Sequence, residues 1–270
     1  MTRGTVAFVM CSTRSGSTWL ALMLGSNSRA QYLGELNRMF RDDAEACSLC
    51  TERGQWCPVF HNMDKVRPRD VHQVLLERTE RQVIVDNSKS LTWARKSLDR
   101  PFDKRFIHLL RDPRAVVYSW QRRGRTKGIE QWIEENYAIR QFLTDAGLDY
   151  RVVTYNELAD HTDETMERLC SWLGLAYEQR QMVYWEFEHH GAGRNGATAS
   201  FLRDYVASDE AYYAEHRRQA FHDKRWQSEL ETDVKEAILR SPRLQQFLDD
   251  FRITLTPDGL EPKLRSASPG

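Results

Sequence analysis

The chain contains no apolar run long enough to cross a membrane and no excess of charge of either sign. Its apolar runs fall far short of the ~18–20 residues that a membrane-spanning helix needs. Residues 1–4 lead into a strand pattern, without the cationic and apolar regions of a signal peptide. Lysine plus arginine equals aspartate plus glutamate, at 39 residues each, so no overall field favours nucleic acid. We therefore expect a cytoplasmic protein without a transmembrane segment and without a nucleic-acid partner.

Internal repeats are also absent, and 270 residues suit a single domain with one core. Strand-like runs alternate with helix-like stretches, and the strand runs are continuously apolar, as in a sheet covered on both faces. Strands are expected near residues 5–11, 82–87, 105–110 and 150–155, and helices near 17–26, 68–80, 113–122, 129–146 and 162–173. This alternation predicts an α/β fold with a central parallel sheet and helices on both faces.

The carboxy-terminal part differs in composition from the rest. Residues 201–250 are rich in charge and aromatic side chains and are expected to be helical. The segment after Thr256 has the composition of a linker. We therefore assign residues 1–256 to the domain and predict that residues 257–270 are a disordered tail.

A Walker A lysine is missing from the most informative segment, which lies near the amino terminus. The apolar run from Val6 to Met10 predicts a buried strand, and Cys11–Thr18, with the sequence CSTRSGST, leads from it into a helix. Such a turn aims backbone N–H groups and the positive end of the helix dipole at one point. A Walker loop has a lysine directly after its second glycine, whereas here the cation, Arg14, precedes Gly16. Arg14 adds a charge that can hold phosphate or sulfate. The segment predicts either an anion site or an ordinary turn whose hydroxyls cap the helix.

A second strand-to-helix junction also carries a cation. The apolar run 105–110 ends at Arg111, and Asp112 and Pro113 suit the N-cap and first turn of a helix. Ser119 lies about two helical turns further along. Arg111 and Ser119 reach one ligand only if this helix leans across the mouth of the first loop. Otherwise they are a surface cation and a neutral helix residue.

These two segments resemble the nucleotide-binding elements of sulfotransferases, in the bacterial and carbohydrate variant whose loop carries Arg. Cys11–Thr18 resembles the 5′-phosphosulfate loop, and Arg111 and Ser119 match the 3′-phosphate-binding positions. The resemblance implies a P-loop-like, three-layer fold and the donor 3′-phosphoadenosine 5′-phosphosulfate (PAPS), with PAP as product and no metal required. The donor-binding residues that it implies are Thr13, Arg14, Ser15, Gly16, Ser17, Thr18, Arg111 and Ser119.

Weaker similarities follow the same family in the same order. Residues 83–89 resemble its D-S-S-K segment, with Asn87 in place of a serine. Residues 150–158 are interpreted as a strand that ends in a Y-E-D-L-like sequence, and residues 191–196 and 223–226 resemble the Gly-Asn loop and D-x-R-W segment that close over the nucleotide. The loop lacks the arginine that usually follows its asparagine. It implies Arg194 and Asn195 as further donor ligands.

The resemblance implies sulfuryl transfer to a hydroxyl or amine of a small-molecule, glycan or lipid acceptor. Arg14 and the loop amides would neutralise the leaving phosphate, and Lys89 would polarise the transferring sulfonate. Glu35, in Leu33-Gly34-Glu35-Leu36, is the candidate base that takes the acceptor's proton. Two alternatives are a small P-loop kinase, which would need a Gly-Lys-Ser/Thr triplet and an aspartate for magnesium, and a non-catalytic nucleotide-binding scaffold.

Cysteine is scarce, with five residues in the chain. Cys47, Cys50, Cys57 and His61 have zinc-ligand chemistry but lie within 15 residues, where structural zinc sites usually separate two ligand pairs more widely. A zinc site, a Cys50–Cys57 disulfide and free thiols in an insertion at about 40–66 are the alternatives, and we predict free thiols and no metal site. The remaining candidates are Cys11 and Cys170, expected to be buried, and His189 and His190, expected to be loop residues that make a poor metal pair.

Overall fold

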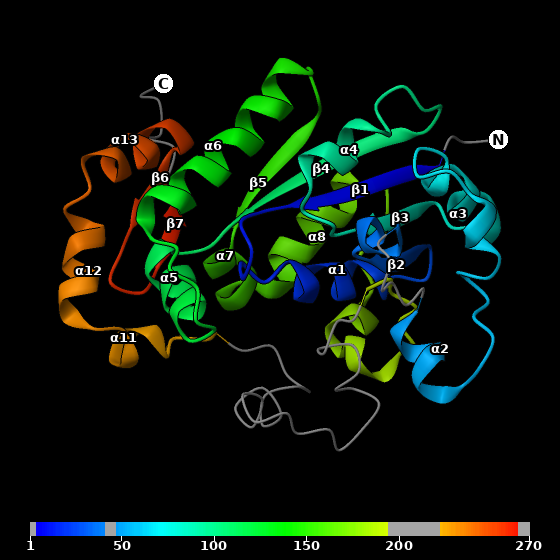
Figure 1. Ribbon diagram of the computed structural model, residues 1–270, viewed down its shortest axis with the longest axis horizontal. Coiled ribbons are helices and arrows are strands. Elements are labelled where there is room, and N and C mark those ends of the chain that lie inside the picture. Colours follow the sequence, from blue (N-terminus) through cyan, green and yellow to red (C-terminus); the bar gives the residue numbers. More distant parts are fainter. Residues whose placement is uncertain (1–3, 41–46, 194–221, 264–270) are drawn as a thin grey trace.

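The computed structural model describes residues 4–40, 47–193 and 222–263. Its centre is a five-stranded sheet in the order β2-β3-β1-β4-β5, in which every neighbouring pair is parallel (Figure 1). The strands are β1 (Thr5–Met10), β2 (Ala30–Gly34), β3 (Val83–Asp86), β4 (Asp103–Leu110) and β5 (Tyr150–Thr154). The predicted α/β fold with a parallel sheet is confirmed.

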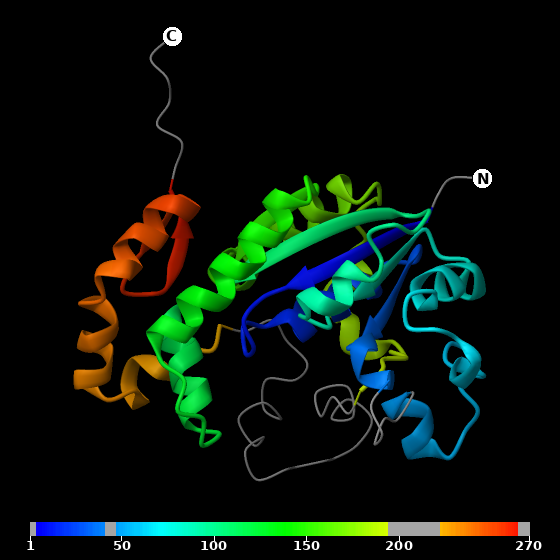
Figure 2. The ribbon, with the colours of Figure 1, turned by 45° about the horizontal axis from the view of Figure 1, so that its top comes forward.

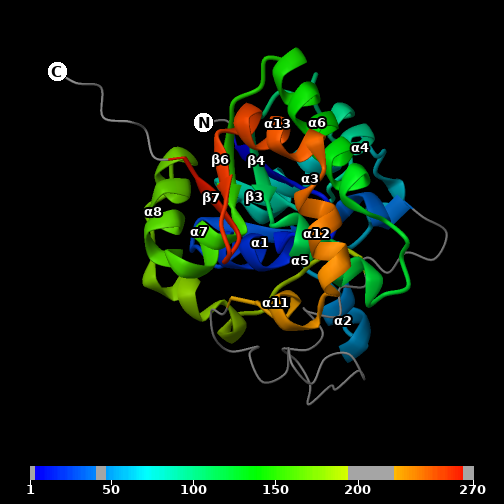
Figure 3. The same cartoon turned by 90° about the vertical axis from the view of Figure 1, so that its left-hand side faces the viewer.

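Helices cover both faces of this sheet (Figures 2 and 3). Along β1, Val6 and Phe8 pack into the core beneath α3 (Val71–Thr79), α4 (Leu91–Arg95) and α6 (Ile129–Asp145). Ala7 and Val9 point the other way, into the core beneath α1 (Ser17–Gly25) and α8 (Thr162–Trp172). Because successive strand residues face opposite sides, a strand buried on both faces must be apolar throughout. This is why the strands are continuous apolar runs.

The prediction missed one strand and extended another too far. Strand β2 was not expected, because it is a short edge strand that carries the polar Gln31. Strand β5 ends at Thr154, which forms a capping box with Glu157 and so starts α7 (Tyr155–Asp160). The strand expected near residues 150–155 is confirmed to within one residue. The interpretation of residues 150–158 as one strand is wrong, since a capping box satisfies the first N–H groups of a helix and sets its beginning.

The carboxy-terminal helices pack beside α5 (Pro113–Gln121) at one end of the sheet (Figure 2). They are α11 (Trp226–Glu229), α12 (Thr232–Leu239) and α13 (Pro242–Phe251). Their apolar side chains form a third core with the buried Trp120 and Trp132. The helical prediction for residues 201–250 is confirmed from Trp226 onward, and residues 201–221 lie outside the described residues.

The predicted disordered tail is wrong for residues 257–263. Strand β7 (Leu260–Pro262) pairs antiparallel with β6 (Ile253–Leu255), and Leu260 is fully buried. Arg114 Nη2 donates to the carbonyl of Thr256 over 2.6 Å. The residues Pro257, Asp258 and Gly259 form the tight turn of this hairpin. Proline, aspartate and glycine are common in tight turns as well as in linkers. Residues 264–270 lie outside the described residues.

The cysteine-containing insertion is part of the core on the α3 side of the sheet. It contains α2 (Ser48–Arg53) and the 3-10 turn η2 (Met63–Lys65), and residues 41–46 lie outside the described residues. Val59 and Phe60 are buried against α3. Two other 3-10 segments, η1 (Leu36–Phe40) and η3 (Gln179–Glu186), follow β2 and α8. Among the described residues, no helix has both the length and the apolar composition needed to cross a bilayer.

Leu260→Ala is expected to destabilise the protein by about 2–5 kcal/mol, because it empties a fully buried position in the third core. The matched control Leu239→Ala removes the same atoms from a side chain that is 52% exposed, and it should change stability by less than about 0.5 kcal/mol. Urea unfolding of the two variants provides the comparison. Equal effects would mean that the β6–β7 hairpin contributes nothing to this core.

Candidate functional site

All five strands end at one edge of the sheet, and each is followed there by a polar or charged residue. The residues are, in sheet order from β2 to β5, Glu35, Lys89, Arg14, Arg111 and Tyr155. In open parallel sheets ligands bind at this edge, where the strand order reverses direction. Three of these positions were predicted from strand ends. Glu35 joins them through the unexpected β2, and Tyr155 was missed, although its place directly after a strand was the available signal.

The loop after β1 has the backbone of an anion cradle. Gly16 has a φ of +92°, and a Cβ there would lie 2.8 Å from the Tyr155 ring, so the position requires glycine. Arg14 is also left-handed, with a φ of +78°. No side chain caps α1, which argues against the alternative that the hydroxyls only cap the helix. Among the described residues, no protein acceptor meets the backbone N–H groups of Gly16 and Ser17, so both groups are available to an anionic ligand.

Helix α5 leans across this loop. Arg14 Nε donates to Ser119 Oγ over 3.0 Å. Arg111 Nη1 donates to the Arg14 carbonyl over 2.9 Å, and Trp120 Nε1 donates to Thr13 Oγ1 over 2.9 Å. Asp112 accepts from the Arg114 backbone N–H and caps α5 as predicted. The two sequence motifs therefore meet at one mouth, which was the condition for a shared ligand.

Arg111 is 7% exposed and lies between the loop and the segment 223–226. Its guanidinium stacks over the Tyr155 ring at 4.3 Å and lies 3.5 Å from Asp223 Oδ2. Burial disfavours the ionised form of Asp223, but hydrogen bonds from Arg225 and the charge of Arg111 outweigh it and lower its pKa to about 2. Arg111 Nε is buried without an acceptor among the described residues. A buried donor of this kind is costly unless a ligand satisfies it.

Glu35 and Lys89 form an ion pair at the other side of the loop. Lys89 Nζ donates to Glu35 Oε1 and to the Asn87 carbonyl, both over 2.8 Å, while Arg38 Nε lies 2.6 Å from Glu35 Oε2. The Lys89 and Glu35 side chains are 12% and 17% exposed. Lys89 has a φ of +58° and is, like Arg14, a left-handed residue other than glycine at this edge. Two of the three predicted catalytic residues, Glu35 and Lys89, are thus brought into contact.

A buried carboxylate holds the turn that presents Lys89. Asp86, at the end of β3, accepts from the Ser88 backbone N–H, from Trp93 Nε1 and from His72 Nε2, each over 2.8 Å. The sequence analysis did not identify Asp86 as the residue that holds this turn. The available signal was an acidic residue at the end of a strand, next to other polar residues. Asn87 Nδ2 then reaches Thr18 Oγ1 on α1 over 3.4 Å.

The predicted Gly-Asn loop is described only at its start. Ala192 pairs with Gly34 as an isolated parallel bridge, and its carbonyl accepts from the Glu35 backbone N–H over 3.0 Å. A Cβ on Gly34 would lie 2.5 Å from that carbonyl, so this close approach requires glycine. Arg194 and Asn195, predicted as donor ligands, lie outside the described residues.

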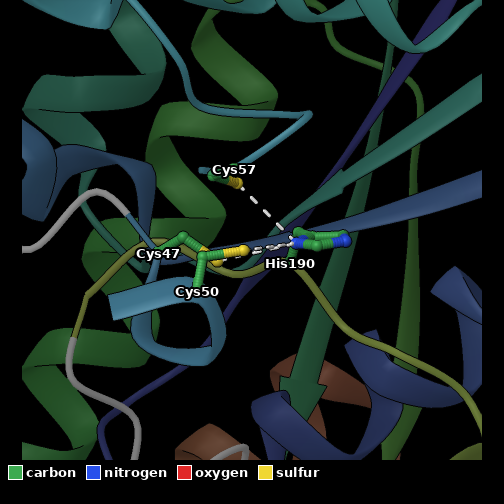
Figure 4. Close-up of side chains that lie close together, drawn as sticks. All are labelled: Cys47, Cys50, Cys57 and His190. Atoms are coloured by element: carbon green, nitrogen blue, oxygen red, sulfur yellow. Dashed lines mark hydrogen bonds between the residues drawn. The ribbon is translucent and has the colours of Figure 1, made fainter. Parts of the chain in front are cut away.

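The sequence analysis grouped His61 with three cysteines as side chains with zinc-ligand chemistry, but in the structure a different histidine lies beside these cysteines. His61 Nδ1 lies 3.1 Å from the Pro58 carbonyl, and its ring stacks on Trp56 at 4.5 Å. His190 Nδ1 instead lies 3.5–3.7 Å from the sulfurs of Cys47, Cys50 and Cys57 (Figure 4). His190 lies in a loop, as expected, and His189 points elsewhere, so the two adjacent histidines do not form a metal pair. The set of four side chains named from local spacing is wrong in one member, because spacing along the chain does not show a partner as distant in sequence as His190.

The cysteines form no disulfide, and all five are free. Cys11 and Cys170 are buried as predicted, and burial raises the pKa of both thiols. The Cys50–Cys57 disulfide alternative is not what the structure contains.

Comparison with known proteins agrees with this architecture. A family model described as the sulfotransferase family matches residues 7–179. The sulfotransferase domain from the curacin biosynthetic pathway has a TM-score of 0.62 and 17% identity, covering 93% of this chain and 98% of that one. The sulfotransferase domain of the Synechococcus PCC 7002 olefin synthase has a TM-score of 0.59 and 18% identity, covering 94% and 97%. No curated protein matches the chain significantly.

The two structural similarities establish the fold, and the family model covers well over half of the chain. Its matched range includes the loop after β1, the Glu35–Lys89 pair and the Arg111–Ser119 element. The fold and the sequence therefore indicate the same family. The chain belongs to the sulfotransferase family.

Proposed function

We propose that the protein transfers the sulfuryl group of PAPS to a hydroxyl or amine of a small-molecule, glycan or lipid acceptor. The observation that carries this proposal is the joining of the two nucleotide-binding motifs through Arg14. Its side chain bonds Ser119, and its carbonyl accepts from Arg111. A donor with phosphates at both its 5′ and 3′ positions needs two anion sites held at a fixed separation.

The residues present fit such a donor. The loop 13–18 would hold the 5′-phosphosulfate through its backbone N–H groups and Arg14. Arg111 would hold the 3′-phosphate with its unpaired Nε. Ser119 Oγ accepts from Arg14, so its own O–H remains to donate to the same phosphate. The space between the loop and helix α5 is cationic, because three arginines lie there with the acidic Asp223. They are Arg14, Arg111 and Arg225.

The reaction is an in-line displacement at sulfur. The acceptor oxygen or nitrogen forms a bond to sulfur while the bond between sulfur and the 5′-phosphate oxygen breaks. Negative charge then grows on that phosphate, where Arg14 and the loop amides stabilise it. Lys89 polarises the sulfonate oxygens, and Glu35 takes the proton that the acceptor loses. The Lys89–Glu35 contact of 2.8 Å keeps the cation and the base adjacent before substrate binds.

The proposal is tested with purified full-length protein, ³⁵S-labelled PAPS and a host metabolite extract, in buffer without magnesium. Labelled product, identified by mass spectrometry, is the expected result. A kinase would instead transfer label from γ-³²P-ATP and only with magnesium. Phosphoryl transfer, or failure to bind PAP in calorimetry, would overturn the proposal.

Arg111→Ala is expected to weaken PAP binding by on the order of 2–3 kcal/mol, about a hundredfold, because it removes a charge-assisted contact from a buried site. Binding of adenosine 5′-phosphate, which lacks the 3′-phosphate, should fall much less. Calorimetry with both nucleotides gives the ratio of the two losses.

Arg114→Ala is the matched control for this variant. Arg114 is equally buried, at 7% exposure, but it bonds Asp112 and stacks over Trp226 instead of contacting the loop. The ratio of the two affinities should stay at the wild-type value. Equal losses for both nucleotides in Arg111→Ala would show that Arg111 only supports the loop.

Glu35→Gln is expected to lower turnover by roughly 10²–10⁴ while leaving the affinity for PAP nearly intact. The loss should be larger for an alkyl alcohol than for a nitrophenol, because an acidic hydroxyl needs less help from a base. The measurement is the ratio of turnover losses across two acceptors of these kinds.

Arg38→Gln serves as the control, because it removes one partner of Glu35 but keeps the carboxylate. It should slow both acceptors modestly and equally. If Glu35→Gln gives the same pattern as Arg38→Gln, Glu35 positions Lys89 and is not the base.

A further inference from the structure

Three thiols from the insertion converge on one imidazole from the other half of the chain. Cys47 and Cys50, at the start of α2, are 1% and 5% exposed, and Cys57 follows the helix. His190 enters this cluster from the segment after η3 (Figure 4). The four potential ligand atoms all lie within 4.8 Å of one another.

The distances from His190 Nδ1 to the three sulfurs match those of a tetrahedral metal site. His190 Nδ1 lies 3.7 Å from Cys47 Sγ, 3.5 Å from Cys50 Sγ and 3.7 Å from Cys57 Sγ. With Zn–S bonds of about 2.3 Å and Zn–N bonds of about 2.0–2.1 Å, tetrahedral geometry requires S···N separations of about 3.5–3.6 Å. The three S···N separations therefore fit a tetrahedral zinc site.

Hydrogen bonding alone does not explain this arrangement. A neutral imidazole nitrogen has a single lone pair, so Nδ1 accepts one good hydrogen bond and not three. The Phe60 backbone N–H donates to Cys57 Sγ over 3.3 Å, a contact that stabilises a thiolate. A single cation, bound by the three sulfurs and by the nitrogen, accounts for this arrangement.

We propose that Cys47, Cys50, Cys57 and His190 bind one structural zinc ion. Three thiolates and one imidazole are a preferred donor set for zinc, whereas magnesium and calcium require oxygen ligands. Four protein ligands fill the tetrahedron and leave no position for substrate, so the ion has no part in sulfuryl transfer. The inference does not depend on the proposed reaction.

The zinc ion would fasten the insertion to the segment beside Glu35. His190 lies two residues from Ala192, whose backbone bonds Leu33 and Glu35 on either side of Gly34. The adjacent His189 points elsewhere, since its Nε2 bonds the Tyr184 carbonyl over 2.6 Å. Among the described contacts, the Arg53–Glu188 ion pair is a further link between these segments, and exposed pairs of this kind contribute little.

The test is the metal content of the purified full-length protein, grown with zinc in the medium and measured by mass spectrometry. We expect about one zinc ion per chain in the wild type. His190→Gln should lose the metal, whereas the matched control His61→Gln should retain it. Cys170→Ala, which removes a buried cysteine outside the cluster, should also retain it.

Cobalt provides a second measurement that needs no variant. Protein stripped of metal should bind one equivalent of Co²⁺ with the intense visible bands of a tetrahedral thiolate site, and zinc should displace it. Zinc should also raise the melting temperature of the stripped protein. The proposal is overturned if the wild type holds no zinc and develops no cobalt bands, if the cysteines are found as a disulfide, or if His61→Gln loses zinc while His190→Gln keeps it.

Discussion

The candidate site depends on the hydrogen bonds that join the loop after β1 to helix α5. Arg14 reaches Ser119 on this helix, and Arg111 reaches back to the Arg14 carbonyl. Without these contacts, the ends of β1 and β4 would present two separate cations. With them, the donors are fixed in place before a ligand arrives, which is what makes electrostatic stabilisation of a leaving group effective.

Holding these side chains in place requires backbone conformations that other residues must support. Arg14 and Lys89 are both left-handed, which costs of order 1–3 kcal/mol for each non-glycine residue. Gly16 lets the first loop approach Tyr155. Asp86 holds the turn before Lys89 by accepting hydrogen bonds from His72, Ser88 and Trp93. Contacts made by Gly16 and by the buried Asp86 thus determine where the side chains of Arg14 and Lys89 lie.

The sequence predicted the parts of the fold that are local. The strands that begin at Thr5 and Val83 are apolar on both faces, and Asp112 caps α5, so both patterns were visible along the chain. Strand β2 was missed because it is short and carries Gln31. Residues 257–263 were predicted as disordered because tight turns and linkers share the same small and polar residues. Composition does not distinguish them, whereas the buried Leu260 does.

By itself, the sequence determined which residues follow each apolar run, and therefore that cations and hydroxyls stand at strand ends. Only the tertiary structure decided which of them meet. It placed Glu35 beside Lys89, Tyr155 beneath Arg111, and His190 instead of His61 among three cysteines. The physical reason is range. Local spacing governs contacts within a few turns, but Cys57 and His190 are 133 residues apart. The order β2-β3-β1-β4-β5 and the helices packed on it determine such contacts, and hydrophobic periodicity does not encode that order.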